Sequence, residues 1–182
     1  MRGLKSKGFR IKRYKPLRGH RRRRIIKHFF NRIHLSSRML EYQELQKILP
    51  QAYPFVLIDR VLEYKEGESL LAIKNVTGSE WCMEGRTAEL NHFPETLLIE
   101  AAAQAALVLY HVTKVGNARF QPQYFIGKTK TDFLSRVYPS QQIVINISSG
   151  KFMDSGGYAD AQITADALTV AVMQLFFKVQ KE

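Results

Sequence analysis

The segment NHFPETLLIE, residues 91–100, brings together two side chains that can exchange protons. The imidazole of His92 can accept a proton near neutral pH, and the carboxyl group of Glu100 can donate one, so the pair suits general acid and base catalysis. Alanines follow Glu100, and burial among apolar groups disfavours a charged carboxylate and raises its pKa. Gln104 lies four residues later on the same helix face, where its amide can orient the carboxyl group. These residues predict an acid site; the structural alternative is an exposed polar strip.

A long helix must position these side chains. The sequence predicts this helix over residues 94–115, with Pro94 at the first helical position and Gly116 just after the end. The helix is apolar on nearly every side, so most of its faces must be buried.

The rest of the chain reads mainly as strands. A short amphipathic helix is predicted over 41–49, followed by a hairpin of strands at 55–64 and 70–77, and a loop covers 81–90. Four further strand candidates follow the long helix, at residues 123–128, 141–149, 157–165 and 168–179. Because helices and strands do not alternate, we expect an α+β fold in which an antiparallel sheet curls around the central helix.

The charge of the chain is concentrated at its start. Residues 1–38 contain fifteen Lys and Arg and no Asp or Glu, whereas the other residues have 13 basic and 16 acidic side chains. We therefore expect a basic N-terminal extension over 1–39, disordered or a short amphipathic helix, and a folded domain over 40–182. The extension could bind RNA or an acidic surface, lie on a membrane, act as an organellar transit peptide, or precede a true start at Met39.

Composition narrows the class of protein. The one cysteine, Cys82, excludes an internal disulfide framework and fits a reducing compartment. No apolar run approaches the roughly 20 residues that span a bilayer, so we expect a soluble, cytoplasmic protein, or an organellar one if the extension is a transit peptide. No metal cluster or nucleotide motif is visible, and no cofactor is expected.

Three separated segments resemble one enzyme family. LPQAYPFVLIDRVLEYKEGESLLAIKNVT (49–77), FPETLLIEAAAQA (93–105) and YFIGKTKTDFLSRVYPSQQ (124–142) are similar to the FabZ-type 3-hydroxyacyl-acyl-carrier-protein dehydratases. The resemblance implies a hot-dog fold over 40–182 and at least a dimer, because the family's sites span two subunits. It also places Glu100 at the catalytic glutamate and Gln104 at the helix glutamine.

The resemblance raises a problem with the base. In the family a histidine removes the α-proton of the thioester, and it lies in a Gly-His-Phe-Pro-Gly motif fourteen residues before the glutamate. Arg86 occupies that position here, while His92 is only eight residues before Glu100. An arginine stays protonated and cannot act as a base. His92 therefore reads as a residue of the helix start, although a rearranged loop could still bring it into action.

The sequence thus predicts a dehydratase-like protein acting on 3-hydroxyacyl-acyl-carrier-protein thioesters in fatty acid or polyketide-type biosynthesis, either as a homodimer or as the histidine-lacking subunit of a heterodimer. The alternative is a noncatalytic acyl-chain or carrier-protein binder, or a scaffold whose basic extension binds RNA or an acidic partner. The expected substrate-binding residues are Phe93, Pro94, Trp81, Met83 and Phe133, and the expected carrier-protein docking residues are Lys128, Lys130 and Arg136.

Overall fold

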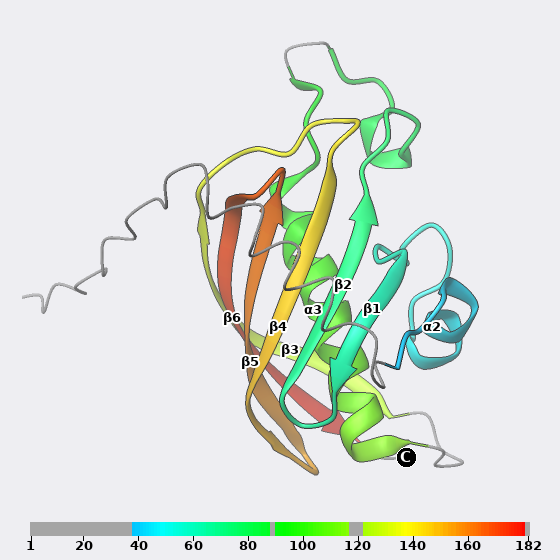
Figure 1. Cartoon of the computed structure of the whole chain (residues 1–182), viewed down its shortest axis with the longest axis vertical. Coiled ribbons are helices and arrows are strands. Elements are labelled where there is room, and N and C mark those ends of the chain that lie inside the picture. Colours follow the sequence, from blue (N-terminus) through cyan, green and yellow to red (C-terminus); the bar gives the residue numbers. More distant parts are fainter. Residues whose placement is uncertain (1–37, 88–89, 117–121, 181–182) are drawn as a thin grey trace, which may run out of the picture. The chain divides into compact units, whose positions relative to one another are not determined.

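The computed structural model describes residues 38–87, 90–116 and 122–180 (Figure 1). The predicted basic extension lies almost entirely outside the described residues, so its conformation and binding stay predictions. The first helix of the described part is α2 (Tyr42–Ile48), whose N-cap residue, Glu41, forms a capping box with Glu44.

In the described part of the chain, six strands form one antiparallel sheet in the order β1-β2-β4-β5-β6-β3. The strands are β1 (Arg60–Lys65), β2 (Ser69–Asn75), β3 (Gln123–Phe133), β4 (Gln142–Met153), β5 (Gly156–Ala165) and β6 (Leu168–Gln180). Figure 1 shows this sheet curving around one long helix, α3, which is the predicted α+β arrangement. Strands β1 and β3 are the two edges.

Helix α3 (Glu95–Tyr110) continues into a π-helical turn, η3 (His111–Val115), and ends at Gly116, which has a positive φ of 55°. Pro94 is the N-cap rather than the first helical residue. All ten residues from 101 to 110 are buried, because the small alanine side chains let the sheet approach the helix closely. By length and composition alone, Glu95–Val115 could cross a membrane, contrary to the expectation that no such stretch exists, but most of it is buried inside the fold.

The segment 55–59 was predicted as part of a strand, but β1 begins only at Arg60. Its polar backbone groups have other partners: the carbonyl of Phe55 and the N–H of Leu57 bond to the Gln104 side chain, and the Asp59 N–H donates to the Ile73 carbonyl. Residues 55–59 therefore precede the sheet instead of extending β1. Phe55 and Leu57 contact Gln104, which shares a helix face with Glu100.

Candidate active site

Glu100 lies half-buried on α3, and two amides hold one of its oxygens. Oε1 accepts hydrogen bonds from Nε2 of Gln104 and from Nε2 of Gln51, each 2.9 Å long. No described group donates to Oε2. The carboxyl group is therefore fixed through one oxygen, and the other oxygen is left to carry or transfer a proton.

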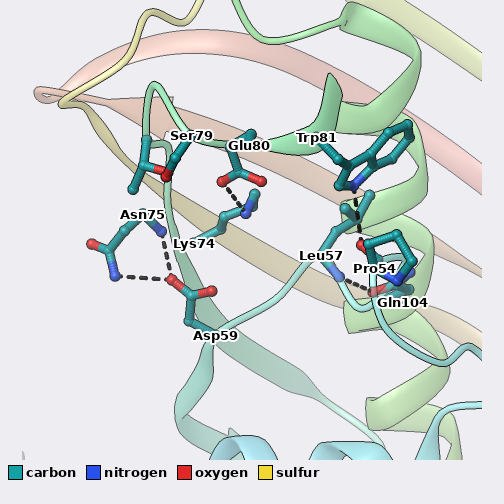
Figure 2. Close-up of polar contacts among 10 residues, drawn as sticks. Pro54, Leu57, Asp59, Lys74, Asn75, Ser79, Glu80, Trp81 and Gln104 are labelled. Carbon is teal, nitrogen blue, oxygen red and sulfur yellow. Dashed lines mark hydrogen bonds and ion pairs between the residues drawn. The ribbon is translucent and has the colours of Figure 1, made fainter. Parts of the chain in front are cut away.

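Gln104 is fully buried, and its orientation is set by the segment before β1. Its Oε1 accepts the Leu57 N–H at 2.8 Å, a contact drawn in Figure 2. Its Nε2 donates to the Phe55 carbonyl at 2.6 Å as well as to Glu100. Since the oxygen must face an N–H donor, the amide cannot be turned around, and Nε2 must point at Glu100.

Gln51 completes this arrangement, and sequence reasoning did not single it out. It follows α2 and donates to Glu100 across 49 positions of sequence. Its own Oε1 is buried without a hydrogen-bond partner among the described residues. The one sequence feature that could have pointed to Gln51 is its position within the segment 49–77, which resembles the family.

Arg86, which was expected at the family's histidine position from the sequence spacing, holds its own loop together through hydrogen bonds to backbone carbonyls. Its Nε donates to the Cys82 carbonyl at 2.9 Å, and Nη1 donates to the carbonyls of Leu90 and His92 at 3.1 and 3.2 Å. Burial raises the pKa of the neighbouring Cys82 thiol, which favours its neutral form. The Arg86 guanidinium is thus hydrogen-bonded to three backbone carbonyl oxygens.

His92 is buried at the start of α3, with 8% of its surface exposed. Its Nδ1 lies 3.3 Å from the Phe93 carbonyl and 3.7 Å from Oε1 of Glu95, and its ring meets the edge of Tyr138. No hydrogen bond between His92 and Glu100 occurs in the described part of the chain. This geometry fits a helix-start residue.

The predicted substrate-binding residues occupy different environments. Phe93 and Met83 are buried, and the Phe93 N–H donates to the Val137 carbonyl at 2.7 Å, which ties the helix start to the segment after β3. Trp81 is exposed and donates from Nε1 to the Pro54 carbonyl (Figure 2). Phe133 is exposed at the end of edge strand β3, and Pro94 caps α3. Trp81 and Met83 thus belong to the loop that Arg86 holds, and Phe93 and Pro94 follow that loop directly along the chain.

A buried ion pair supports the same loop, and sequence reasoning missed it. Lys74, at 5% exposed, places Nζ 2.7 Å from Oε1 of Glu80 and 5.6 Å from the centre of the Phe93 ring. Figure 2 shows the pair beside Asn75, whose backbone N–H and side chain both donate to Asp59. The pair links β2 to the loop before α3.

The three predicted docking residues are spread along β3 and beyond it. Lys128 lies opposite Phe176 and Lys130 opposite Gln174 in the pairing of β3 with β6. Arg136 follows β3 and precedes Val137, which contacts Phe93. Arg136 is therefore adjacent in sequence to a residue that contacts the start of α3.

A single antiparallel sheet wrapped around one helix is the arrangement of a hot-dog protein, and here the helix carries a glutamate whose carboxylate is held by two amides. A family model described as a FabA-like domain matches residues 49–174 of this chain. FabZ, a 3-hydroxyacyl-acyl-carrier-protein dehydratase, from Clostridium botulinum is 33% identical over 145 residues, 80% of this chain and 99% of the relative. The same enzyme from Actinobacillus pleuropneumoniae is 39% identical over 118 residues, 65% of this chain and 77% of the relative. The chain belongs to this family and is a FabZ-type hot-dog dehydratase homologue.

Two solved structures support the fold. A dehydratase heterocomplex, ApeI:P, from Xenorhabdus doucetiae aligns with a TM-score of 0.63 at 15% identity, covering 75% of this chain and 90% of the other. A mutant thioesterase from Pseudomonas aeruginosa aligns with a TM-score of 0.59 at 13% identity, covering 79% and 96%. The predicted hot-dog fold is confirmed.

Replacing Arg86 by histidine is expected to loosen the loop, because an imidazole cannot reach three carbonyls. We expect a loss of about 1–3 kcal/mol in the free energy of unfolding, on the scale of charged hydrogen bonds, measured by urea denaturation. Arg60→Met is the control, because Arg60 forms an exposed ion pair with Glu41 whose loss should cost less than about 1 kcal/mol. Equal losses in the two variants would contradict the bracing role of Arg86.

Proposed function

We propose that this chain supplies the acid half of a dehydratase site whose base comes from a histidine-bearing hot-dog partner. The observation that carries the proposal is an asymmetry. Glu100 is held by the amides of Gln51 and Gln104, which together form its amide clamp, whereas Arg86, expected at the base position from the family's spacing, has its guanidinium bonded to three carbonyls. A homodimer would then hold two acids and no base.

The chemistry assigned to each group follows from these contacts. The partner's imidazole removes the proton from C2 of a 3-hydroxyacyl thioester, and that electron pair forms the C2–C3 double bond. The C3–O bond breaks, and Glu100 gives the proton on Oε2 to the departing hydroxyl, which leaves as water. The N-terminal end of α3 stabilises the negative charge that develops on the thioester oxygen.

The substrate class is proposed from the relatives. The FabZ relatives are described as 3-hydroxyacyl-acyl-carrier-protein dehydratases, and this description supports a role for the chain in fatty acid or polyketide-type biosynthesis. Phe93, Met83 and Trp81 line the acyl path near the site, and Arg136, with Lys128 and Lys130, attracts the acidic carrier protein. The ApeI:P dehydratase, described as a heterocomplex, is a precedent for two different hot-dog chains in one enzyme.

A complementation assay tests the proposal. The partner is a FabZ-type relative that keeps its histidine but carries glutamine at its own catalytic glutamate, so its homodimer lacks the acid. The two chains are coexpressed with different tags, and the mixed assembly is isolated through both tags. We expect 2-enoyl thioester to form only in the mixed assembly. An inactive mixed assembly, or none recovered from any histidine-bearing relative, rejects the proposal.

Edge strand β3 is the proposed dimerisation surface. Among the described strands, β3 pairs with β6 alone, and Phe133 and the following Leu134 are exposed at the end of β3. A long edge strand presents backbone N–H and C=O groups that can pair with a second chain. Replacing both residues by lysine should weaken dimerisation at least about tenfold, measured by light scattering during gel filtration. Leu168→Lys, at an exposed site at the start of β6, should leave the dimer intact; if it dissociates as well, β3 is not the specific interface.

A noncatalytic binding role is the second candidate. The engagement of both Arg86 and His92 by neighbouring groups favours it, because neither is placed to take a substrate proton. A mixed assembly that binds acyl carrier protein but forms no enoyl product would support this candidate. The other alternative, RNA binding by the basic extension, stays a prediction because that extension lies almost entirely outside the described residues.

A further inference from the structure

The outer face of the sheet, away from α3, carries a row of aromatic and basic side chains. Lys151 of β4 lies opposite Tyr158 of β5, Tyr158 opposite Phe176 of β6, and Phe176 opposite Lys128 of β3. In the neighbouring row, Phe125 of β3 lies opposite Lys178 of β6. We call this surface the aromatic platform; it consists of Phe125, Lys128, Lys151, Tyr158, Phe176 and Lys178.

Two of the platform's three rings lie open to solvent beside a cavity, and the third, that of Tyr158, is half-buried. Phe176 is 38% exposed and Phe125 is 48% exposed, although both are large apolar side chains. The Tyr158 ring lies directly over Gly150, where a Cβ atom would come within 2.4 Å of three ring atoms, and its centre is 5.6 Å from that of Phe176 with a 28° tilt. The platform borders a cavity of about 680 Å³. Exposed apolar groups gathered in this way mark an interaction site.

The charge on the platform identifies the kind of partner. None of the lysines at positions 128, 151 and 178 forms an ion pair with a described residue, and no acidic residue lines the cavity. The nearby Asp160 is bonded to Gln174 instead. A second copy of the chain docked here through a two-fold axis would bring these lysines against each other. The surface therefore fits an anionic partner that also offers flat apolar faces.

We propose that the aromatic platform binds single-stranded nucleic acid. The row from Lys151 to Lys128 crosses three strand spacings, about 14 Å, with a cation at each end and two rings between them. Exposed aromatic side chains on a sheet hold two or three unpaired bases by stacking, and flanking lysines hold the phosphates. The fifteen basic residues of positions 1–38 add a sequence-independent attraction for the same polyanion. This site is separate from Glu100.

The test measures binding of the full chain to a fluorescein-labelled oligouridine of about 12 nucleotides, by fluorescence anisotropy. Replacing both Tyr158 and Phe176 by leucine should weaken binding about tenfold or more, because stacking is lost while the net charge is unchanged. Leu168→Ala, another change at an exposed apolar residue, should leave affinity unchanged. A 4-thiouridine strand should crosslink to peptides containing Tyr158, Phe176 or Phe125.

If the aromatic variant fails to fold, two double-lysine variants still test whether the platform binds the oligonucleotide. Replacing Lys151 and Lys178 by glutamine should weaken binding more than replacing Lys47 and Lys65, which removes the same charge elsewhere. Lys128 is left unchanged because it also belongs to the carrier-docking proposal. Equal losses in the two lysine pairs, crosslinks confined to residues 1–38, or binding of acyl carrier protein but not of the oligonucleotide would each overturn the platform proposal.

Discussion

Replacing Glu100 by glutamine is expected to reduce dehydration by the mixed assembly by about 10²–10⁴-fold, the usual contribution of a positioned general acid. Glutamine can still accept the amide hydrogen bonds of Gln51 and Gln104 through its own oxygen. At the position of Oε2, however, it carries an amide nitrogen that cannot protonate a leaving hydroxyl. The change therefore removes the proton and keeps the clamp. Formation of the enoyl thioester, followed by mass spectrometry, measures the loss.

Two further variants show whether the loss belongs to Glu100. Glu95→Gln removes a carboxyl group from the same helix, and we expect activity to stay within about threefold, because Glu95 contacts His92 rather than the clamp. His92→Ala should likewise leave turnover in place, since the partner supplies the base. If Glu100→Gln keeps activity while His92→Ala destroys it, the acid and base assignments are wrong.

The contact between Glu100 and Gln104 was accessible from sequence because both residues lie on one helix. Residues four apart on a helix share a face, so the contact between Glu100 and Gln104 could be predicted from spacing, and its 2.9 Å hydrogen bond confirms that prediction. Gln51 could not be found in this way. It reaches Glu100 only because the chain after α2 folds back over α3, and no periodicity encodes that path.

The extended segment before β1 shows why strand limits are harder to predict. Residues 55–59 have the apolar, β-branched composition of a strand, but the Gln104 side chain takes the polar backbone groups of Phe55 and Leu57. A tertiary contact therefore overrides local propensity. Strand β3 was instead predicted too short. The prediction ended at Lys128, whereas the strand continues to Phe133, because this exposed continuation lacks the apolar alternation of a half-buried strand.

Replacing Lys74 by methionine is expected to lower the free energy of unfolding by about 3–5 kcal/mol, because it leaves the Glu80 carboxylate buried without its counter-ion. Both side chains of the pair are largely shielded from water, and Lys74 also lies against the ring of Phe93. The variant should unfold at a lower urea concentration, with an unchanged dependence of stability on urea.

The ion pair between Lys65 and Glu68 provides the matched control. It joins the same two residue types, but both side chains are exposed, so Lys65→Met should cost less than about 1 kcal/mol. Replacing Glu80 by leucine together with Lys74→Met removes the stranded charge and should recover most of the loss. Equal costs for the two lysine variants, or no recovery in the double variant, would mean that burial does not govern this pair. Recovery of stability without recovery of turnover in the mixed assembly would assign the Lys74–Glu80 pair a part in shaping the loop before α3 as well as in holding the fold together.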